Sequence, residues 1–347
     1  MKILALDLGK YKTVGCDYER ETGQHRFKGS LTTRACLTQL VKEVKPDRVV
    51  IEVCNIAGWV CDSLRAMGVE VQVANTNDDA WRWRKVKKKN DRRDALKAAQ
   101  LSAVNQIKEV YIPQVEVRQW RALIAFRQQL VRRRGRMKNH IRDLLVTEGE
   151  LLPRGASCWT KIGMARLEAM ARPLTEVGLN ELWRGQLDLE LRQLKAVQQE
   201  IAAAEAKLDA IAAADPRIKL LRTIPGVGPR LAEAIVALLD RPERFHKASE
   251  VSAYIGMVPK ELDSGETVRR GPITKQGSRL VRSLLVEVAW AGLRHNPWVR
   301  ETYQRISGGK KSRKKIAIVA VGRRLLVRCW AMLRDGTSWR TEMPKAA

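Results

Sequence analysis

Short apolar runs alternate with stretches of helical spacing over residues 2–74, and this order constrains the fold more than any other feature of the chain. The run KILALDL at 2–8 predicts a buried strand, and Gly9 and Lys10 predict a tight turn after it. Further strands are predicted over 14–18, 24–29, 48–53 and 69–74, with helices over 33–44 and 57–67. The order strand, strand, strand, helix, strand, helix, strand is typical of an α/β layer fold.

The remainder of the chain is predicted to be mostly helical. A basic segment with two tryptophans at 81–94 precedes a helix over 95–104, and one or two long basic helices follow over 115–148. Pro216 opens a third region that is also mostly helical. The fold class expected is therefore α/β plus all-α, with domains over 1–112, 113–215 and 216–347.

The middle domain contains a stretch, 186–213, without Gly or Pro and rich in Ala, Leu, Glu and Gln. Its apolar residues follow a heptad-like seam, which predicts a coiled-coil arm. The seam residues are Leu187, Leu191, Leu194, Ile201 and Leu208, and Gln198 and Glu205 interrupt it.

The charge of the chain indicates its partner class. Lys and Arg number 65 against 38 Asp and Glu, which gives a formal net charge of +27. Such a charge repels itself unless a polyanion screens it, so nucleic acid is the expected partner. No apolar run approaches the roughly 20 residues of a membrane-spanning helix, and no membrane partner is expected.

The cysteines and the first residues indicate the compartment. The six cysteines are scattered without a Cys-x-x-Cys pair, as expected for free thiols in a reducing cytosol. The start, MKILALDLGKYKT, is too short and too polar for a signal peptide. A cytoplasmic, nucleoid-associated protein of bacterial type is the expectation.

Four carboxylates are candidates for a metal site. Asp7 ends the first apolar run, Glu52 ends a later one, and Asp91 and Asp94 are spaced i, i+3 where a helix begins. Converging acids repel one another unless a divalent cation neutralises them, and hard oxygen ligands select Mg²⁺ or Mn²⁺. The alternative is that each acid is ordinary, with Asp94 a helix cap and Glu52 a satisfied strand-end acid.

Two glycine-containing segments are candidate phosphate contacts. LDLGKYKT, around Gly9, resembles the phosphate loop of actin-like or sugar-kinase ATPases, but no second Gly-rich turn accompanies it. IPGVGPRLAEAIVALL at 224–239 resembles a helix-hairpin-helix, in which backbone N–H groups at Gly226 and Gly228 would meet phosphates. A plain helix–turn–helix packing unit is the alternative for the second segment.

The stretch 256–285 carries two candidate nucleophiles. Ser264 lies among turn residues crowded by cations, and a serine there could attack a phosphodiester. Turn preference explains Ser264 equally well, and N-capping of a helix explains its rival Ser278.

Basic residues and two tryptophans are the predicted nucleic-acid contacts, through phosphate binding and base stacking. Most of the ten tryptophans are expected to be packing residues instead. The predicted contacts are Lys10, Trp81, Trp83, Arg84, Lys87, Lys88, Lys89, Arg92, Arg133, Lys138, Gly226, Gly228, Arg269, Arg270, Lys275, Arg279, Lys310 and Lys311.

Taken together, these motifs resemble the DEDD transposases of insertion sequences, recombinases guided by a bridge RNA. The similarity lies in LDLGK, VVIE, KNDRRDA, the segment from LLRTIPGVG, the stretch YIGMVPKELDSGETVRRGPITKQGS and GGKKSRKK. The family usually continues small-Thr-Gly after the glutamate, whereas Val53, Cys54 and Asn55 follow Glu52 here. The long middle, 115–213, is similar only in being helical.

The resemblance implies an N-terminal RuvC-like, RNase-H-type domain with Asp7, Glu52, Asp91 and Asp94 as its metal tetrad. It implies a C-terminal transposase domain whose nucleophile is Ser264 rather than Ser278. The family's site is composite: the acids of one subunit work with the serine of another in a dimer or tetramer. A structured non-coding guide RNA pairs with donor and target DNA.

The function expected is an RNA-guided DNA recombinase that forms a phosphoserine intermediate. Two alternatives stay open. One is a metal-dependent Holliday-junction-type nuclease with water as nucleophile, and the other is a non-catalytic nucleic-acid-binding protein.

Overall fold

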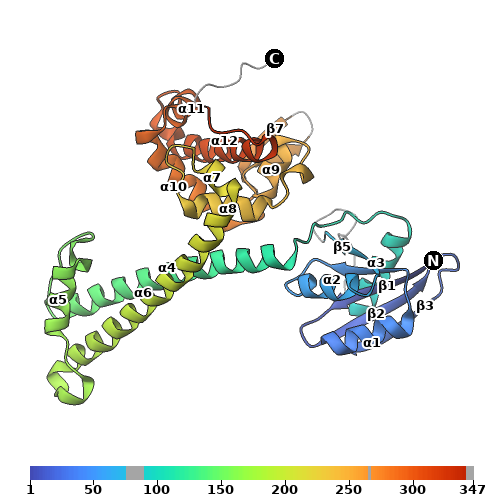
Figure 1. Ribbon diagram of the computed structural model, residues 1–347, viewed down its shortest axis with the longest axis horizontal. Helices are drawn as coiled ribbons and strands as arrows, with labels where there is room; N and C mark the ends of the chain where they lie inside the picture. The colour runs from blue at the N-terminus through green and yellow to red at the C-terminus, as the bar shows by residue number, and fades with distance from the viewer. Residues whose placement is uncertain (76–89, 265–266, 341–347) are drawn as a thin grey trace. The chain divides into compact units, whose positions relative to one another are not determined.

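The computed structural model describes residues 1–75, 90–264 and 267–340, with backbone alone at 261–264 and 267–270. The chain forms two compact units, Met1–Gln119 and Trp120–Ala347. Figure 1 shows the chain coloured from blue at the N-terminus to red at the C-terminus. The mixed α/β fold class is confirmed, with a sheet in the N-terminal part and helices in the C-terminal part.

The first unit is built on a five-stranded sheet in the order β3-β2-β1-β4-β5. Strand β1 (Lys2–Leu8) pairs antiparallel with β2 (Lys12–Glu19), which pairs antiparallel with β3 (His25–Leu31). On its other side β1 pairs parallel with β4 (Arg48–Glu52), which pairs parallel with β5 (Glu70–Ala74). All five strands predicted from the apolar runs are confirmed.

Helices cover both faces of this sheet (Figure 1). Helices α1 (Arg34–Val44) and α2 (Ala57–Arg65) bury their apolar sides in one cluster with alternate residues of β1 and β4. Helix α3 (Asp91–Ala103) packs on the opposite face, against Ile3, Ala5 and Val50. Its buried face is alanine-rich, at 95, 98, 99 and 103, and small side chains let a helix lie close to a sheet.

Helix α3 begins at Asp91, whereas the helical spacing predicted a start at Ala95. The earlier start has a local cause. The side chain of Asn90 accepts a hydrogen bond from the Arg92 N–H at 3.0 Å, which caps the first turn. Asp91 and Asp94 are therefore both in the first turn of the helix.

The second unit contains a long helix, α6 (Leu182–Ala214), and most of another, α4 (Val115–Thr147), whose first residues belong to the first unit. Helix α5 (Lys161–Met170) lies between them in the chain. The region 115–148 is thus one long helix. All five predicted seam residues of α6 are buried, and Val197 and Ala204 complete the seam. The seam residues from Leu187 to Ile201 share a buried cluster with Ile141 and Leu145 of α4, so the two helices pack on each other. Leu208 belongs to the core of the C-terminal helices.

The C-terminal helices pack around a central one, α8 (Pro229–Leu239), which is buried continuously from Leu231 to its end. A helix that is buried on all sides and is mostly apolar lies inside a helical domain. Around it lie α7 (Pro216–Leu221), α9 (Ala248–Tyr254), α10 (Arg279–His295), α11 (Pro297–Ser307) and α12 (Lys314–Asp335). Short 3-10 helices lie at Ser157–Trp159, Leu174–Glu176, Leu179–Glu181, Pro242–Arg244 and Lys311–Arg313.

The fold places the cysteines and the tryptophans. All six cysteines lie in the described residues and are free thiols, as predicted. Trp120, Trp298 and Trp330 are buried core residues, as expected for most tryptophans. No helix in the described part of the chain is both long enough and apolar enough to cross a membrane.

A buried acid lies in the middle of α8. The Glu233 side chain is 1% exposed and forms an ion pair with Arg230 at 3.1 Å. Arg230 also pairs with Asp209 of α6. Burial, only partly offset by Arg230, raises the pKa of Glu233 from 4.5 to about 7. Because the folded-state pKa lies above the unfolded value, the folded protein binds more protons between these values, and stability falls as pH rises through them.

We therefore expect Glu233→Gln, which mimics the protonated acid, to gain stability relative to the wild type as pH rises from 5 to 8. The gain should approach about 3 kcal/mol at most, the free energy that corresponds to the raised pKa. Urea unfolding of both proteins at pH 5 and pH 8 measures it. Equal differences at the two pH values would show that Glu233 ionises normally in the fold.

Candidate active site

Two of the four candidate acids are neighbours in the sheet. Strands β1 and β4 are parallel, and Leu6 pairs with Ile51, so Asp7 and Glu52 follow side by side at the carboxyl ends of the strands. Side chains alternate along a strand, which places both acids on the sheet face that α3 covers. Loops and helix ends at the carboxyl edge of parallel strands commonly build the functional sites of α/β folds.

The other two acids lie in the first turn of α3, which covers that same face. Asp94 is 6% exposed, whereas Asp91 is exposed to solvent. The partial positive charge at a helix N-terminus stabilises carboxylates in this position. The i, i+3 spacing predicted that the two acids share one face of the helix, and both lie in its first turn, one buried and one exposed.

The donor chemistry of these acids fits a hard divalent cation. Carboxylate oxygens are the ligands that Mg²⁺ and Mn²⁺ prefer, and all four are carried by β1, β4 and α3 of one unit. Among the described residues, no three His, Cys, Asp or Glu side chains are already gathered into a ligand set. The fit therefore rests on the donor types and on the sheet face that they share.

The glycine after β1 has a structural role at this edge. The N–H of Gly9 donates to the carbonyl of Lys12 at 3.1 Å, which closes a tight turn between β1 and β2. A Cβ at Gly9 would overlap the Lys12 carbonyl oxygen, so only glycine fits here. This close approach explains the glycine of the LDLGK motif without a bound phosphate.

Ser264 lies on a β-hairpin that projects from the helices of the second unit. It is the last residue of β6 (Pro259–Ser264) and pairs with Thr267, the first residue of β7 (Thr267–Ile273). Exposed turns were predicted at Asp263, Ser264, Gly265 and Gly271. Asp263, Ser264 and Gly271 lie in the two strands instead, and Gly265 lies outside the described residues. These strands were not predicted because PKELDS and TVRRGPI lack alternating apolar residues.

The root of this hairpin is held by two glycines and one arginine. Gly256 and Gly277 both have positive φ, 67° and 77°, and a Cβ on either would overlap backbone atoms of the facing segment. Arg282 Nη1 donates to the carbonyl oxygens of Ile255 at 2.7 Å, Gln276 at 2.8 Å and Gly277 at 3.2 Å. The hairpin thus leaves the helical core from a fixed point.

Gly277→Ala should accordingly destabilise the second unit by several kcal/mol, because the new Cβ adds a backbone clash to the cost of positive φ. Gly308→Ala is the matched control, because Gly308 has φ 55° but open space around its Cα. It should lose only about 1 kcal/mol. Chemical unfolding of the two variants measures both losses, and equal values would contradict a tightly packed root.

The rival serine has a complete structural explanation. Ser278 is the N-cap of α10, and its Oγ accepts a hydrogen bond from the Val281 N–H at 3.3 Å. The interpretation of Ser278 as a helix cap is confirmed. Its hydroxyl is engaged in stabilising the helix start.

The predicted helix-hairpin-helix corresponds to α7, a loop and α8. Gly226 adopts φ 89°, and Gly226 and Gly228 are exposed. The Asn296 side chain donates to the Pro225 carbonyl at 3.1 Å and holds the loop. The two helices and their turn occur as predicted, while phosphate binding by this loop stays a prediction.

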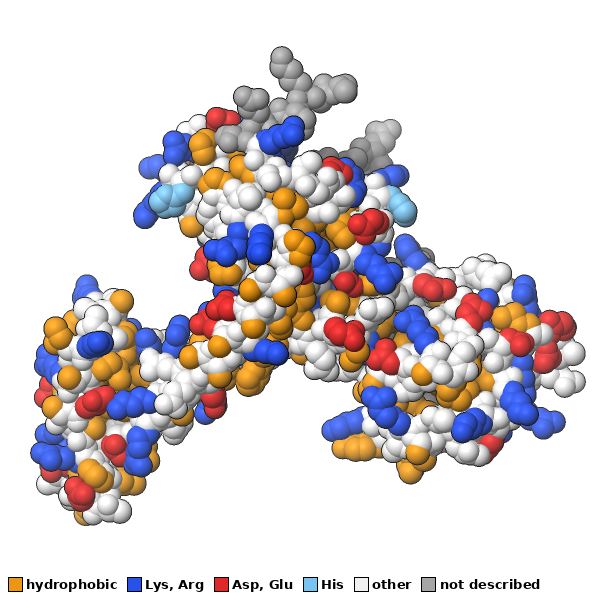
Figure 2. Space-filling model, in the orientation of Figure 1, with side chains coloured by type: hydrophobic (Ala, Val, Ile, Leu, Met, Phe, Trp, Pro, Cys, Tyr) orange, Lys and Arg blue, Asp and Glu red, His pale blue; other side chains and the backbone are white. Residues whose placement is uncertain are grey.

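The other predicted nucleic-acid contacts are distributed over both units. On the face shown in Figure 2, Lys and Arg side chains occur over each described part of the chain. Lys138 is partly buried, with its Nζ 4.8 Å from the centroid of the Trp159 ring. Exposed are Lys10, Arg92, Arg133, Lys275, Arg279, Lys310 and Lys311. Outside the described residues are Trp81, Trp83, Arg84, Lys87, Lys88 and Lys89, as are the side chains of Ser264, Arg269 and Arg270.

The sequence did not single out a groove beside the hairpin root. Arg282, Val286 and Trp290 of α10 line it, together with Met257 and residues of other elements. Their i, i+4 spacing along 279–290 is the signal that could have identified one helix face with cations at one end and an aromatic residue at the other.

Two family models match the chain. A DEDD-type transposase model of IS110 matches residues 4–148, and the model described as "Transposase IS116/IS110/IS902 family" matches residues 218–304. The first covers the three elements that carry the acids, and the second covers α8 to α10 with the hairpin between them.

Proteins named as transposases in three bacteria match most of the chain. The transposase of insertion sequence element IS1111A from Coxiella burnetii is 30% identical over 302 residues, covering 85% of this chain and 79% of the relative. A probable family 20 transposase of Pseudomonas aeruginosa is 28% identical, covering 97% and 98%. A putative transposase of Sinorhizobium fredii is 26% identical, covering 89% and 78%.

Proposed function

This chain belongs to the IS110-type transposase family, enzymes that cut and rejoin DNA, and we propose that it does so with a serine nucleophile and a carboxylate-bound metal ion. The nucleophile is the Ser264 hydroxyl. The metal ligands are Asp7, Glu52, Asp91 and Asp94, on an N-terminal domain of RuvC-like, RNase-H type.

The observation that carries this proposal is the placement of the acids. Asp7 and Glu52 are register neighbours at the ends of two parallel strands, on the face that α3 covers. The first turn of α3 brings the buried Asp94 to that face. Three acids from separate elements lie on one face of the sheet. One ligand bound by all of them explains this better than three unrelated structural roles would.

The proposed reaction conserves the number of phosphodiester bonds. The Ser264 oxygen attacks a DNA phosphorus atom, an O–P bond to serine forms, and the bond from phosphorus to the 3′ oxygen breaks. The serine proton is transferred to the leaving strand, which becomes a free 3′-hydroxyl. A 3′-hydroxyl of another strand then attacks the phosphoserine and releases the serine. The bond energy stays in the covalent link, so no nucleotide triphosphate is consumed.

A bound divalent ion would polarise the phosphate and neutralise the charge that develops on it. The protein residues around the reaction hold the DNA and orient the nucleophile. The clamp of Arg282 on the hairpin root fixes the strand that carries Ser264, and exposed Lys and Arg side chains bind phosphates. We propose that the acids of one copy act with the serine of another, in a dimer or tetramer.

The choice of DNA sequence is assigned in this proposal to a structured non-coding RNA. The net charge of +27 supports a polyanionic partner, and the resemblance of the motifs to bridge-RNA-guided recombinases supports RNA as one such partner. DNA, as donor and target, is the other.

Sequencing of the RNA that co-purifies with the protein tests this assignment. We expect one short RNA species with two internal loops, recovered from cells that carry the complete insertion sequence and retained through a wash at moderate salt. A heterogeneous set of cellular RNAs, lost in the same wash, would contradict RNA guidance. That outcome would leave the serine mechanism in place.

A further inference from the structure

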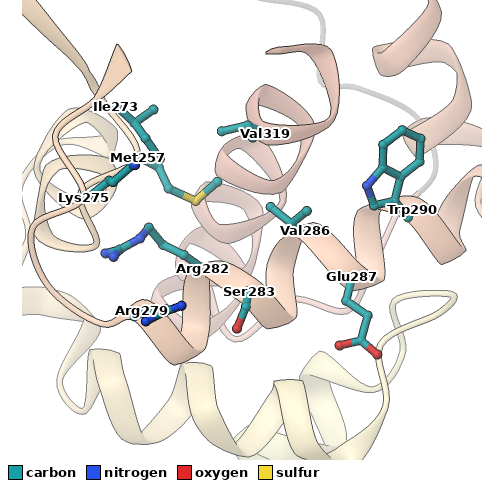
Figure 3. Close-up of a pocket in the computed structure, with 10 residues that line it drawn as sticks. All are labelled: Met257, Ile273, Lys275, Arg279, Arg282, Ser283, Val286, Glu287, Trp290 and Val319. Carbon is teal, nitrogen blue, oxygen red and sulfur yellow. The ribbon is translucent and has the colours of Figure 1, made fainter. Parts of the chain in front are cut away.

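An open groove of about 840 Å³ lies beside the hairpin root in the second unit (Figure 3). One wall is the face of α10 from Arg279 to Trp290, which lie at opposite ends of the labelled stretch of helix. From Arg279 to Trp290 the helix rises by eleven steps, or roughly 16 Å, which is longer than the base and phosphate of one nucleotide need. The proposed reaction uses Arg282 to hold the hairpin root and phosphate contacts at Lys275 and Arg279, and it gives no role to the rest of the groove.

One end of the groove is cationic. Lys275 and Arg279 are exposed there, and Arg282 lies next to them. Among the described residues none of these three cations forms an ion pair with an acid. Burial and the neighbouring charge of Arg279 lower the pKa of the Arg282 guanidinium. An anion at this end would relieve the repulsion between the cations.

The other end carries an aromatic residue, Trp290, and one exposed acid, Glu287, and the base of the groove is apolar. Met257 is 2% exposed, and Val286 and Val319 line the groove beside it. The Trp290 ring lies at the far end, with Lys314 Nζ 5.1 Å from its centroid and the Tyr303 ring 6.3 Å away. An apolar surface that ends in a tryptophan suits the flat face of a nucleobase.

We propose that this groove binds an unpaired stretch of nucleic acid, with its phosphates at Lys275 and Arg279 and a base against Trp290. A duplex presents its charged backbone outwards and keeps its base faces stacked, so it can satisfy the cationic end only. A single strand can satisfy both ends.

The inference rests on the proposed function only in that nucleic acid is the partner. The groove lies where β7 returns to the helices, so its occupant would enter beside the Ser264 hairpin.

Photocrosslinking in the Ser264→Ala background tests the groove without strand cleavage. Short single-stranded DNA and RNA oligonucleotides that carry 5-iodouracil are bound, irradiated and mapped by mass spectrometry after trypsin digestion. The sequence gives the tryptic peptide 283–294, SLLVEVAWAGLR, whose single aromatic residue is Trp290. We expect the adduct on this peptide, with excess unlabelled single strand competing about tenfold better than duplex of the same length. Comparison of the DNA and RNA oligonucleotides identifies which strand binds.

Two variants check the assignment. Lys275→Ala with Arg279→Ala should reduce the yield of this adduct about tenfold and lower the salt slope of single-strand binding by roughly 1.4. Lys219→Ala with Lys247→Ala removes the same charge from exposed positions outside the groove and should leave the adduct unchanged. Equal competition by duplex, or adducts only on other peptides, would overturn the inference. Neither result bears on whether Ser264 forms a covalent link to DNA.

Discussion

Asp94→Asn should lower the rate of DNA strand cleavage by about 10³-fold or more while leaving the fold and DNA binding intact. Asn keeps the size of the side chain but removes the negative charge that a divalent ion requires. Asp94 is the most informative of the four acids because it is buried at the sheet face shared with Asp7 and Glu52. The loss is that expected when charge stabilisation of a phosphoryl transfer is removed.

The measurement is strand cleavage of a donor or target DNA on a denaturing gel, at several concentrations of Mg²⁺ and Mn²⁺. Glu116→Gln is the matched control, because Glu116 is an exposed acid of the same unit and is not one of the four candidate ligands. It should cleave at the wild-type rate. Chelation of divalent ions should abolish cleavage by the wild type. Wild-type rates for Asp94→Asn would remove this acid from the site.

Ser264→Ala should abolish both strand cleavage and the covalent protein–DNA adduct. The alanine side chain has no oxygen to attack phosphorus, and the acids alone would retain only DNA binding. Ser278→Ala is the control within the same stretch of chain. It loses the N-cap of α10, which costs about 1 kcal/mol of stability, and should cleave at a rate close to wild type.

The two serine variants also separate the alternative functions. If Ser264→Ala still cleaves DNA in a metal-dependent way, water is the nucleophile and the protein is a junction-type nuclease. If both Ser264→Ala and Asp94→Asn leave every activity unchanged, the chain acts as a nucleic-acid-binding protein.

The sheet of the first unit could be predicted because its information is local. Each strand is a short apolar run. A buried parallel strand such as β4 is apolar along its length, so it can be recognised without knowing which strand lies beside it. The proximity of Asp7 and Glu52 also follows once β1 and β4 are neighbours. The different exposure of Asp91 and Asp94 could not be predicted, since it depends on how closely the alanine face of α3 approaches the sheet.

The hairpin and groove of the second unit depend on contacts between distant parts of the chain. Gly256 and Gly277 face each other across the hairpin root, and Arg282 reaches carbonyls on both sides of it. A turn-rich sequence with alternating charges does not reveal such contacts. In α6, by contrast, the predicted seam is a local pattern, and Val197 and Ala204 are buried beside its interruptions at Gln198 and Glu205.

The most direct test of the account is to identify the residue that becomes linked to DNA. A substrate nicked close to the cleavage site would release a short fragment, prevent religation and trap the intermediate. Mass spectrometry of the digested adduct should then find the DNA phosphate on Ser264, and only when Asp7, Glu52, Asp91 and Asp94 are intact and a divalent ion is present. A link on another residue, or cleavage that proceeds without any link, would contradict the account.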